Sequence, residues 1–184
     1  MKRLGRHRLL LLIFSILSVA VMAVIFFFSH QSGDASTALS EGFSKQTKGT
    51  GLSALTPVVR LGSDEEGKDG TKGFSLELNV RKWGHIYLYA LLGITTMLWS
   101  TELLRGRRLR LPAGALIALG ICMLYGCTDE FHQTFVDSRE GKPFDLIYDA
   151  LGSGGGIILV LLLLLLAGLI HKIYRQRRRA NDPH

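Results

Sequence analysis

Side chains able to exchange protons near neutral pH gather in one short stretch of this sequence. Asp129, Glu130 and His132 lie almost side by side, and a second histidine, His85, follows a basic pair earlier in the chain. A carboxyl group beside an imidazole can serve as an acid–base pair, because histidine takes up and returns a proton near pH 7. We therefore predict that Asp129, Glu130, His132 and His85 are catalytic residues.

Helical spacing sorts the members of this stretch. If residues 129–133 are helical, Asp129, His132 and Gln133 share one face at steps of three and four, and they could share one pocket. Glu130 then points about 100° away from Asp129. We expect Glu130 to line the edge of that pocket or to pair with a nearby basic residue such as Arg139.

Basic and amide side chains in the same regions could hold a substrate. Arginine binds phosphate through paired hydrogen bonds and lysine binds it as a point charge, so such a set suits the phosphate of a lipid head group. The stretch offers usable metal ligands but no compact ligand motif, and we expect neither a metal nor another cofactor. The predicted substrate-binding residues are Gln133, Arg139, Asp145, Lys82, Ser29 and Gln31.

The elements that must position these side chains are four apolar blocks. Each is apolar on nearly every face, unlike a helix of a soluble domain, and each is close to the roughly 20 residues that cross a bilayer core. The first block is also longer than the apolar part of a signal peptide, about 7–15 residues, so we expect it to remain as a helix. We predict a single all-α domain, residues 1–184, that is an integral membrane bundle of four transmembrane helices at residues 9–28, 83–104, 112–134 and 146–173.

Charge predicts the orientation of these helices. Thirteen of the 22 Lys and Arg residues precede the first block, separate the second from the third, or lie in or beside the basic tail 174–184. Because short basic segments stay in the cytoplasm, we expect both termini to be cytoplasmic and residues 29–82 to form an outer loop. The same pairing of basic residues with apolar runs explains the net charge of +7 without a nucleic-acid partner.

This topology brings polar groups from all four blocks to the outer membrane face, which favours one shared site there. Two other features concern packing. Gly152 and Gly156 are spaced for close contact between helices. Cys122 and Cys127 are five positions apart on one helix and point in different directions, so we expect no disulfide between them.

Several motifs of the chain resemble those of the VanZ-like family, in the same order. Residues 29–31 resemble the family's S-x-Q element, and residues 81–93 resemble its R-K-x-x-H-x-x-x-Y-x-x-L-G element. Residues 129–133 resemble its D-E-x-H-Q element. Positions that match further along the chain are Arg139, Asp145 and Gly152. The chain departs from the family at Asp149, where Asn is frequent, and at residues 137–138, where Pro-Gly is common.

The resemblance implies a multi-pass protein of the bacterial plasma membrane that acts at the cell envelope and lowers susceptibility to the glycopeptide teicoplanin. It implies membrane lipid as a partner, with a lipid-linked cell-wall precursor or a glycopeptide as further candidates. An enzyme that modifies lipid head groups or precursors and a non-catalytic binding or scaffold protein fit the residues about equally. A small proton-coupled transporter fits less well, because four helices are few and no internal repeat is apparent.

Overall fold

The computed structural model describes residues 2–48, 54–57, 59–61, 76–78, 80–137 and 145–181. These residues are almost entirely helical, which confirms the all-α part of the predicted fold class. The helices are α1 (Lys2–Ser29), α2 (Gly33–Thr47), α3 (Val80–Leu103), α4 (Arg110–Gln133) and α5 (Leu146–Asn181). Two short strands, β1 (Val59–Leu61) and β2 (Leu76–Leu78), pair as an antiparallel ribbon with Val59 opposite Leu78.

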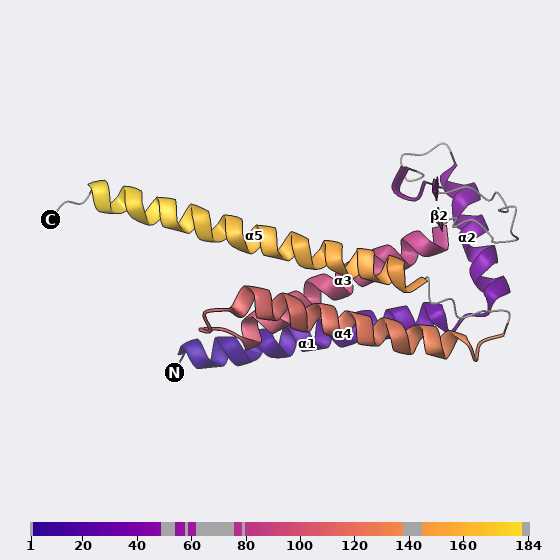
Figure 1. Ribbon diagram of the computed structural model, residues 1–184, viewed down its shortest axis with the longest axis horizontal. Helices are drawn as coiled ribbons and strands as arrows, with labels where there is room; N and C mark the ends of the chain where they lie inside the picture. Colours follow the sequence, from indigo (N-terminus) through magenta and orange to yellow (C-terminus); the bar gives the residue numbers. More distant parts are fainter. Residues whose placement is uncertain are drawn as a thin grey trace, which may run out of the picture.

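The long helices form a bundle with α3 at its centre. Helix α3 packs against α1, α4 and α5, whereas α1 touches α4 only lightly. Figure 1 shows α1, α3 and α4 side by side, while α5 crosses α3 with its first half and then diverges and runs past the N-terminus. Helix α2 lies across the end of the bundle opposite the two termini (Figure 1). That end therefore brings together parts of every helix.

Three helices in the described part of the chain are long and apolar enough to cross a membrane: Gly5–Ser29, Arg110–Gln133 and Leu146–Arg178. Four such helices were predicted, and three of them, α1, α4 and α5, are confirmed. The fourth, α3, is not apolar enough to be counted with them. Charged residues near both ends of α3 lower its apolar character, among them Arg81, Lys82 and Glu102, and so do hydroxyl side chains that α3 turns inward. Thr96 donates to the Leu92 carbonyl at 2.6 Å, and Ser100 donates to the Gly114 carbonyl of α4 at 2.8 Å.

The boundaries of the elements differ from the prediction in two places. The segment 29–82 was predicted to be a loop, but α2 occupies part of it. Leu39 and Phe43, one turn apart on α2, lie at a pocket shared with α1 and α3. Helix α5 was predicted to end at residue 173 and instead continues to Asn181, because Lys, Arg and Gln are good helix formers and no Gly or Pro interrupts them.

The core is divided between the two halves of the bundle. In the half near α2, Ile25, Tyr89, Leu92 and Cys122 pack together, all fully or almost fully buried. A second cluster, in which α5 takes part, fills the other half. Cys122 is buried in the first cluster and Cys127 is exposed, and both are free thiols.

Glycine residues allow α3 and α5 to approach closely, as predicted for Gly152 and Gly156. A Cβ atom built at Gly152 would collide with the backbone carbonyl oxygen of Ile86, and one at Gly156 would collide with that of Ala90. Gly93 of α3 meets the α5 backbone in the same way. Backbone atoms cannot move aside as a flexible side chain can, so this contact fixes how α5 sits on α3.

Candidate functional site

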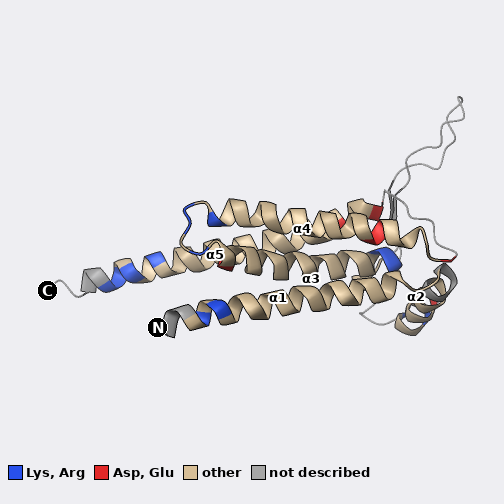
Figure 2. Ribbon diagram, turned by 90° about the horizontal axis from the view of Figure 1, so that it is seen from below, with Lys and Arg blue, Asp and Glu red and all other residues tan. Residues whose placement is uncertain are grey.

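Acidic side chains are buried at the end of the bundle that α2 crosses. The exposed fractions of Asp129 and Glu130 of α4 and Asp149 of α5 are 3%, 8% and 0%. Figure 2 shows acidic residues at this end of α4 and most of the basic residues at the opposite end, beside the termini. Burial of a carboxylate away from water is costly unless it is paired, so three buried carboxyl groups at one end indicate a functional site.

Asp129 joins α4 to α1. The Ser29 hydroxyl donates a hydrogen bond to Asp129 Oδ2 at 2.8 Å, and the Gln133 amide donates to the same oxygen at 3.0 Å. The predicted sharing of one face by Asp129 and Gln133 is therefore present, and Ser29 completes the group. Asp129 Oδ1 is buried without a hydrogen-bond partner among the described residues, so this carboxyl group retains capacity to accept a proton or a bond.

His132 does not share this pocket, contrary to the prediction. Its Nε2 lies 3.2 Å from Nδ1 of His30, and its ring packs on Phe26 with a centroid distance of 4.8 Å. The physical reason is the helical step: three residues after Asp129 the side chain points to the flank of α1 rather than to Ser29. His132 is consequently on the rim of the bundle.

The other predicted catalytic histidine, His85, pairs with an acid on α5. Its Nδ1 lies 3.3 Å from Oδ1 of the fully buried Asp149. The ring of Tyr89 stacks on His85, with centroids 6.3 Å apart and planes 10° apart. Since Nδ1 is engaged by Asp149, Nε2 is the ring nitrogen left for a ligand.

Gly126 of α4 makes room for the two remaining polar atoms of this group. A Cβ atom there would lie 3.3 Å from Asp149 Oδ2 and 3.6 Å from the Tyr89 hydroxyl. Both of these oxygens are buried with no hydrogen-bond partner among the described residues. A carboxyl oxygen and a phenol thus face the same small space between α3, α4 and α5.

Glu130 was predicted to line the edge of the pocket, but its side chain is buried inside the bundle. Its carboxyl group is within electrostatic range of Asp145, Asp149 and His85. The Glu130 side chain points about 100° around α4 from Asp129. This direction leads into the contact between α4 and α5, which explains why Glu130 is buried. The alternative partner predicted for Glu130, Arg139, lies outside the described residues.

Two basic residues at the start of α3 have different surroundings. A guanidinium nitrogen of Arg81 lies 3.6 Å from Oδ2 of Asp145. The ammonium group of Lys82 donates to the Tyr148 hydroxyl at 3.1 Å and stands 4.7 Å from the centre of that ring. Lys82 is therefore turned toward α5 and does not line the pocket described next, whereas Arg81 does.

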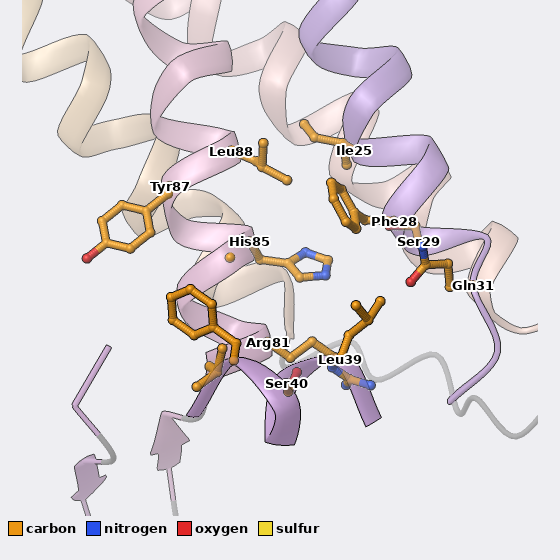
Figure 3. Close-up of a pocket in the computed structure, with 13 residues that line it drawn as sticks. Ile25, Phe28, Ser29, Gln31, Leu39, Ser40, Arg81, His85, Tyr87 and Leu88 are labelled. Atoms are coloured by element: carbon orange, nitrogen blue, oxygen red, sulfur yellow. The ribbon is translucent and has the colours of Figure 1, made fainter. Parts of the chain in front are cut away.

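A pocket of about 400 Å³ lies between α1, α2 and α3. Figure 3 shows the His85 ring reaching into it between Phe28, Leu39 and Arg81. Its polar lining includes Ser29 and Gln31, both predicted to bind substrate, and most of the remaining wall is apolar. His85 is thus the connection between an accessible pocket and the buried carboxyl groups.

Sequence reasoning placed Asp149, Tyr89, Arg81 and α2 outside the proposed set of site residues. Asp149 follows Asp145 by one helical turn, and Arg81 precedes His85 by one turn, so a search for polar side chains on one helix face could have found both. The contribution of α2 carried only the weak signal of two apolar residues one turn apart. Among the described residues no three His, Cys, Asp or Glu side chains are grouped closely enough to hold a metal ion.

The fold and this site define a class: a helical membrane protein whose buried acidic and imidazole side chains gather at one end of the bundle. A family model described as VanZ/LLP1 matches residues 14–166, and the chain belongs to that family. The match takes in all the site residues described above and confirms the resemblance inferred from the motifs. Comparison with curated proteins and with solved structures gave no match.

Proposed function

We propose that this VanZ-like protein acts at the bacterial cell envelope, where its outward-facing pocket binds and acts on a membrane lipid or a lipid-linked cell-wall precursor. The observation that carries the proposal is the position of His85. It reaches into an accessible, largely apolar pocket while its other ring nitrogen is held by the buried Asp149. Lowered susceptibility to teicoplanin is the expected effect on the cell.

The proposal includes a fourth membrane span, α3, and cytoplasmic termini. Helix α3 has 24 residues, or about 36 Å at 1.5 Å per residue, which exceeds a hydrocarbon core of about 30 Å. Its surroundings also support this span, since α1, α4 and α5 pack around it. The basic end of the bundle in Figure 2 suits the cytoplasmic side, and this supports an outward-facing pocket.

Single cysteines test this orientation. In a chain carrying Cys122→Ala and Cys127→Ser, we expect Ser44→Cys on α2 to react with a membrane-impermeant maleimide in intact cells. Gln176→Cys, near the end of α5, should react only after the cells are lysed. Both positions are exposed, so burial does not explain a difference. The reverse pattern of labelling would place the pocket in the cytoplasm and remove the proposed role in the envelope.

The site has the parts needed for proton transfer. His85 can take a proton from a bound hydroxyl group or water at Nε2, while Asp149 orients the ring and stabilises its charged form. The proton can then return to a leaving group on the same ligand.

A non-catalytic binding protein is the second candidate, and the contacts of Asp129 favour it. Asp129 accepts hydrogen bonds from Ser29 of α1 and Gln133 of α4, so this acid also holds two helices together. In a binding protein, the buried acids would shape and stiffen the pocket, and an amide of the same shape could replace a carboxylate with modest loss.

Teicoplanin susceptibility of a sensitive bacterial host separates the two candidates. We expect wild type to protect relative to empty vector, and Glu130→Gln and Asp129→Asn to lose protection at matched membrane levels. The control is Glu41→Gln, which makes the same chemical change on the exposed face of α2. Equal protection by the two site variants would exclude proton chemistry at these acids. If wild type itself gives no protection, the link to teicoplanin fails.

A further inference from the structure

We infer that the ligand of the pocket between α1, α2 and α3 is a phosphate-bearing membrane lipid. In this inference it enters sideways from the outer leaflet, with its phosphate at Arg81 and His85 and its chain along the apolar wall. The inference rests on the proposed function, because it names the chemical class that the same pocket would take. It is carried by the charge, shape and position of the lining.

The charge of the lining selects an anion. Thirteen of the described residues line the pocket, and these include the basic side chains of Arg81 and His85 but no Asp or Glu. Two acids of the site are engaged outside this lining. Asp149 contacts His85 at its Nδ1 atom, and Asp129 accepts hydrogen bonds from Ser29 and Gln133. A cationic head group would therefore meet only basic and neutral side chains.

Arg81 is suited to receive a phosphate. Its contact with Asp145, at 3.6 Å, is longer than a hydrogen bond of 2.7–3.2 Å. Guanidinium carries five N–H donors in a planar fork that matches two phosphate oxygens. Arg81 and His85 line the same pocket and lie within electrostatic range of each other, and Figure 3 shows the Arg81 side chain beneath Leu39 with the His85 ring above it. The two basic groups can thus act on one anion.

The position of the apolar wall indicates a lipid rather than a free phosphate ion. Phe28 of α1 and Leu39 and Phe43 of α2 line the pocket, yet their exposed fractions are 47%, 56% and 40%. Phe28 lies in the last turn of the membrane helix α1, and α2 crosses that end of the bundle, so these exposed apolar side chains can contact acyl chains there instead of water. A lipid can therefore enter between α1 and α3 under α2 without leaving the bilayer.

The size of the pocket narrows the ligand further. At about 400 Å³, it is near the lower end of the roughly 300–1,000 Å³ found for small-ligand sites. That space accepts a phosphate group and the first part of one chain, with the remainder of the chain in the bilayer. A glycopeptide antibiotic is too large for it, so the antibiotic itself is not the expected occupant.

Three probes of matched structure test this inference on the purified full-length chain in a neutral detergent. We expect dodecyl phosphate to raise the Tm by about 5 °C at saturation, because a ligand that binds only the folded state stabilises it. Dodecanol, which has the chain without the phosphate, and inorganic phosphate, which has no chain, should leave the Tm unchanged. An equal shift with either of these two probes would overturn the inference.

Variants of the basic residue give the second part of the test. Arg81→Gln should abolish the shift caused by dodecyl phosphate, and Arg81→Lys should retain a weaker shift, because lysine keeps the charge but loses the fork. Lys45→Gln removes a basic charge from the exposed face of α2 and should respond as wild type does. If Arg81→Gln does not fold, the comparison of Arg81→Lys with wild type decides, and equal dodecyl phosphate affinity would overturn the inference.

The two proposals fail in different ways. One outcome is that the protein binds dodecyl phosphate through Arg81 and yet gives no protection against teicoplanin. That result would support the lipid site and contradict the proposed effect on the cell. Protection without any response to dodecyl phosphate would support the proposed function and remove the phosphate-bearing lipid.

Discussion

His85→Gln should abolish protection against teicoplanin, whereas His132→Gln should leave most of it intact. The sequence assigned both histidines to catalysis, but their surroundings differ. His85 contacts the buried Asp149 and lines the pocket, while His132 contacts His30 and Phe26 at the rim. Loss of a positioned acid–base group commonly lowers a rate by about 10²–10⁴-fold, enough to remove the effect on growth.

The measurement is the minimal inhibitory concentration of teicoplanin for cells that carry equal amounts of each variant in the membrane. His132→Gln serves as the matched control, because it makes the same substitution on the same side of the membrane. If both variants protect as well as wild type, neither imidazole takes part in the function. If only His132→Gln loses protection, the functional site lies between α1 and α4 instead of in the pocket.

Gly156→Leu should lower the Tm of the purified protein by roughly 2–12 °C, while Gly155→Leu should change it little. A side chain at Gly156 meets the backbone of α3 at Ala90, and overpacking of a tight contact commonly costs about 1–3 kcal/mol. For a chain of this size, about 1 kcal/mol corresponds to roughly 2–4 °C in Tm. Gly155 is exposed on α5, and a Cβ there meets nothing within 4 Å.

Unfolding followed by intrinsic fluorescence in detergent gives the two values of Tm. Because both variants place the same leucine on the same helix, any general effect on helix propensity cancels between them. Equal Tm values would mean that α5 does not sit tightly on α3. The position of Asp149 beside His85 would then lack its main support.

Sequence reasoning succeeded where one helix carries the whole signal. The apolar blocks predicted α1, α4 and α5 because membrane helices are apolar on nearly every side. The spacing of Asp129 and Gln133 predicted that they lie together because both are on α4. It failed where the outcome depends on how helices pack. The pairing of His85 with Asp149 joins two helices, and their relative rotation is decided by glycine contacts between α3 and α5. The spacing of Gly152 and Gly156 predicted a close helix contact but did not indicate which helix would be the partner.

The same limit explains the pocket. Helix α2 has few apolar residues, and nothing in its own sequence indicates that Leu39 and Phe43 would cover His85. Their position depends on the path of the chain between α1 and α3. The sequence prediction gave α3 the same apolar character as the other three helices, but its Thr96 and Ser100 hydroxyl groups donate hydrogen bonds to backbone carbonyls inside the bundle.

Helix α5 has the proportions of a lever. Its 36 residues span about 54 Å. It is pressed on α3 from Gly152 to Gly156, and Gly156, the last of these contacts, is the pivot for the rest of the helix. From that pivot to Asn181 is about 38 Å, and from the pivot back to Asp149 is about 10 Å. If the straight helix tilts about Gly156, a displacement of its basic C-terminal end is about four times as large as the resulting displacement of Asp149. A shift of about 4 Å at the basic end of α5 becomes about 1 Å beside His85, a distance that can change a rate about a hundredfold.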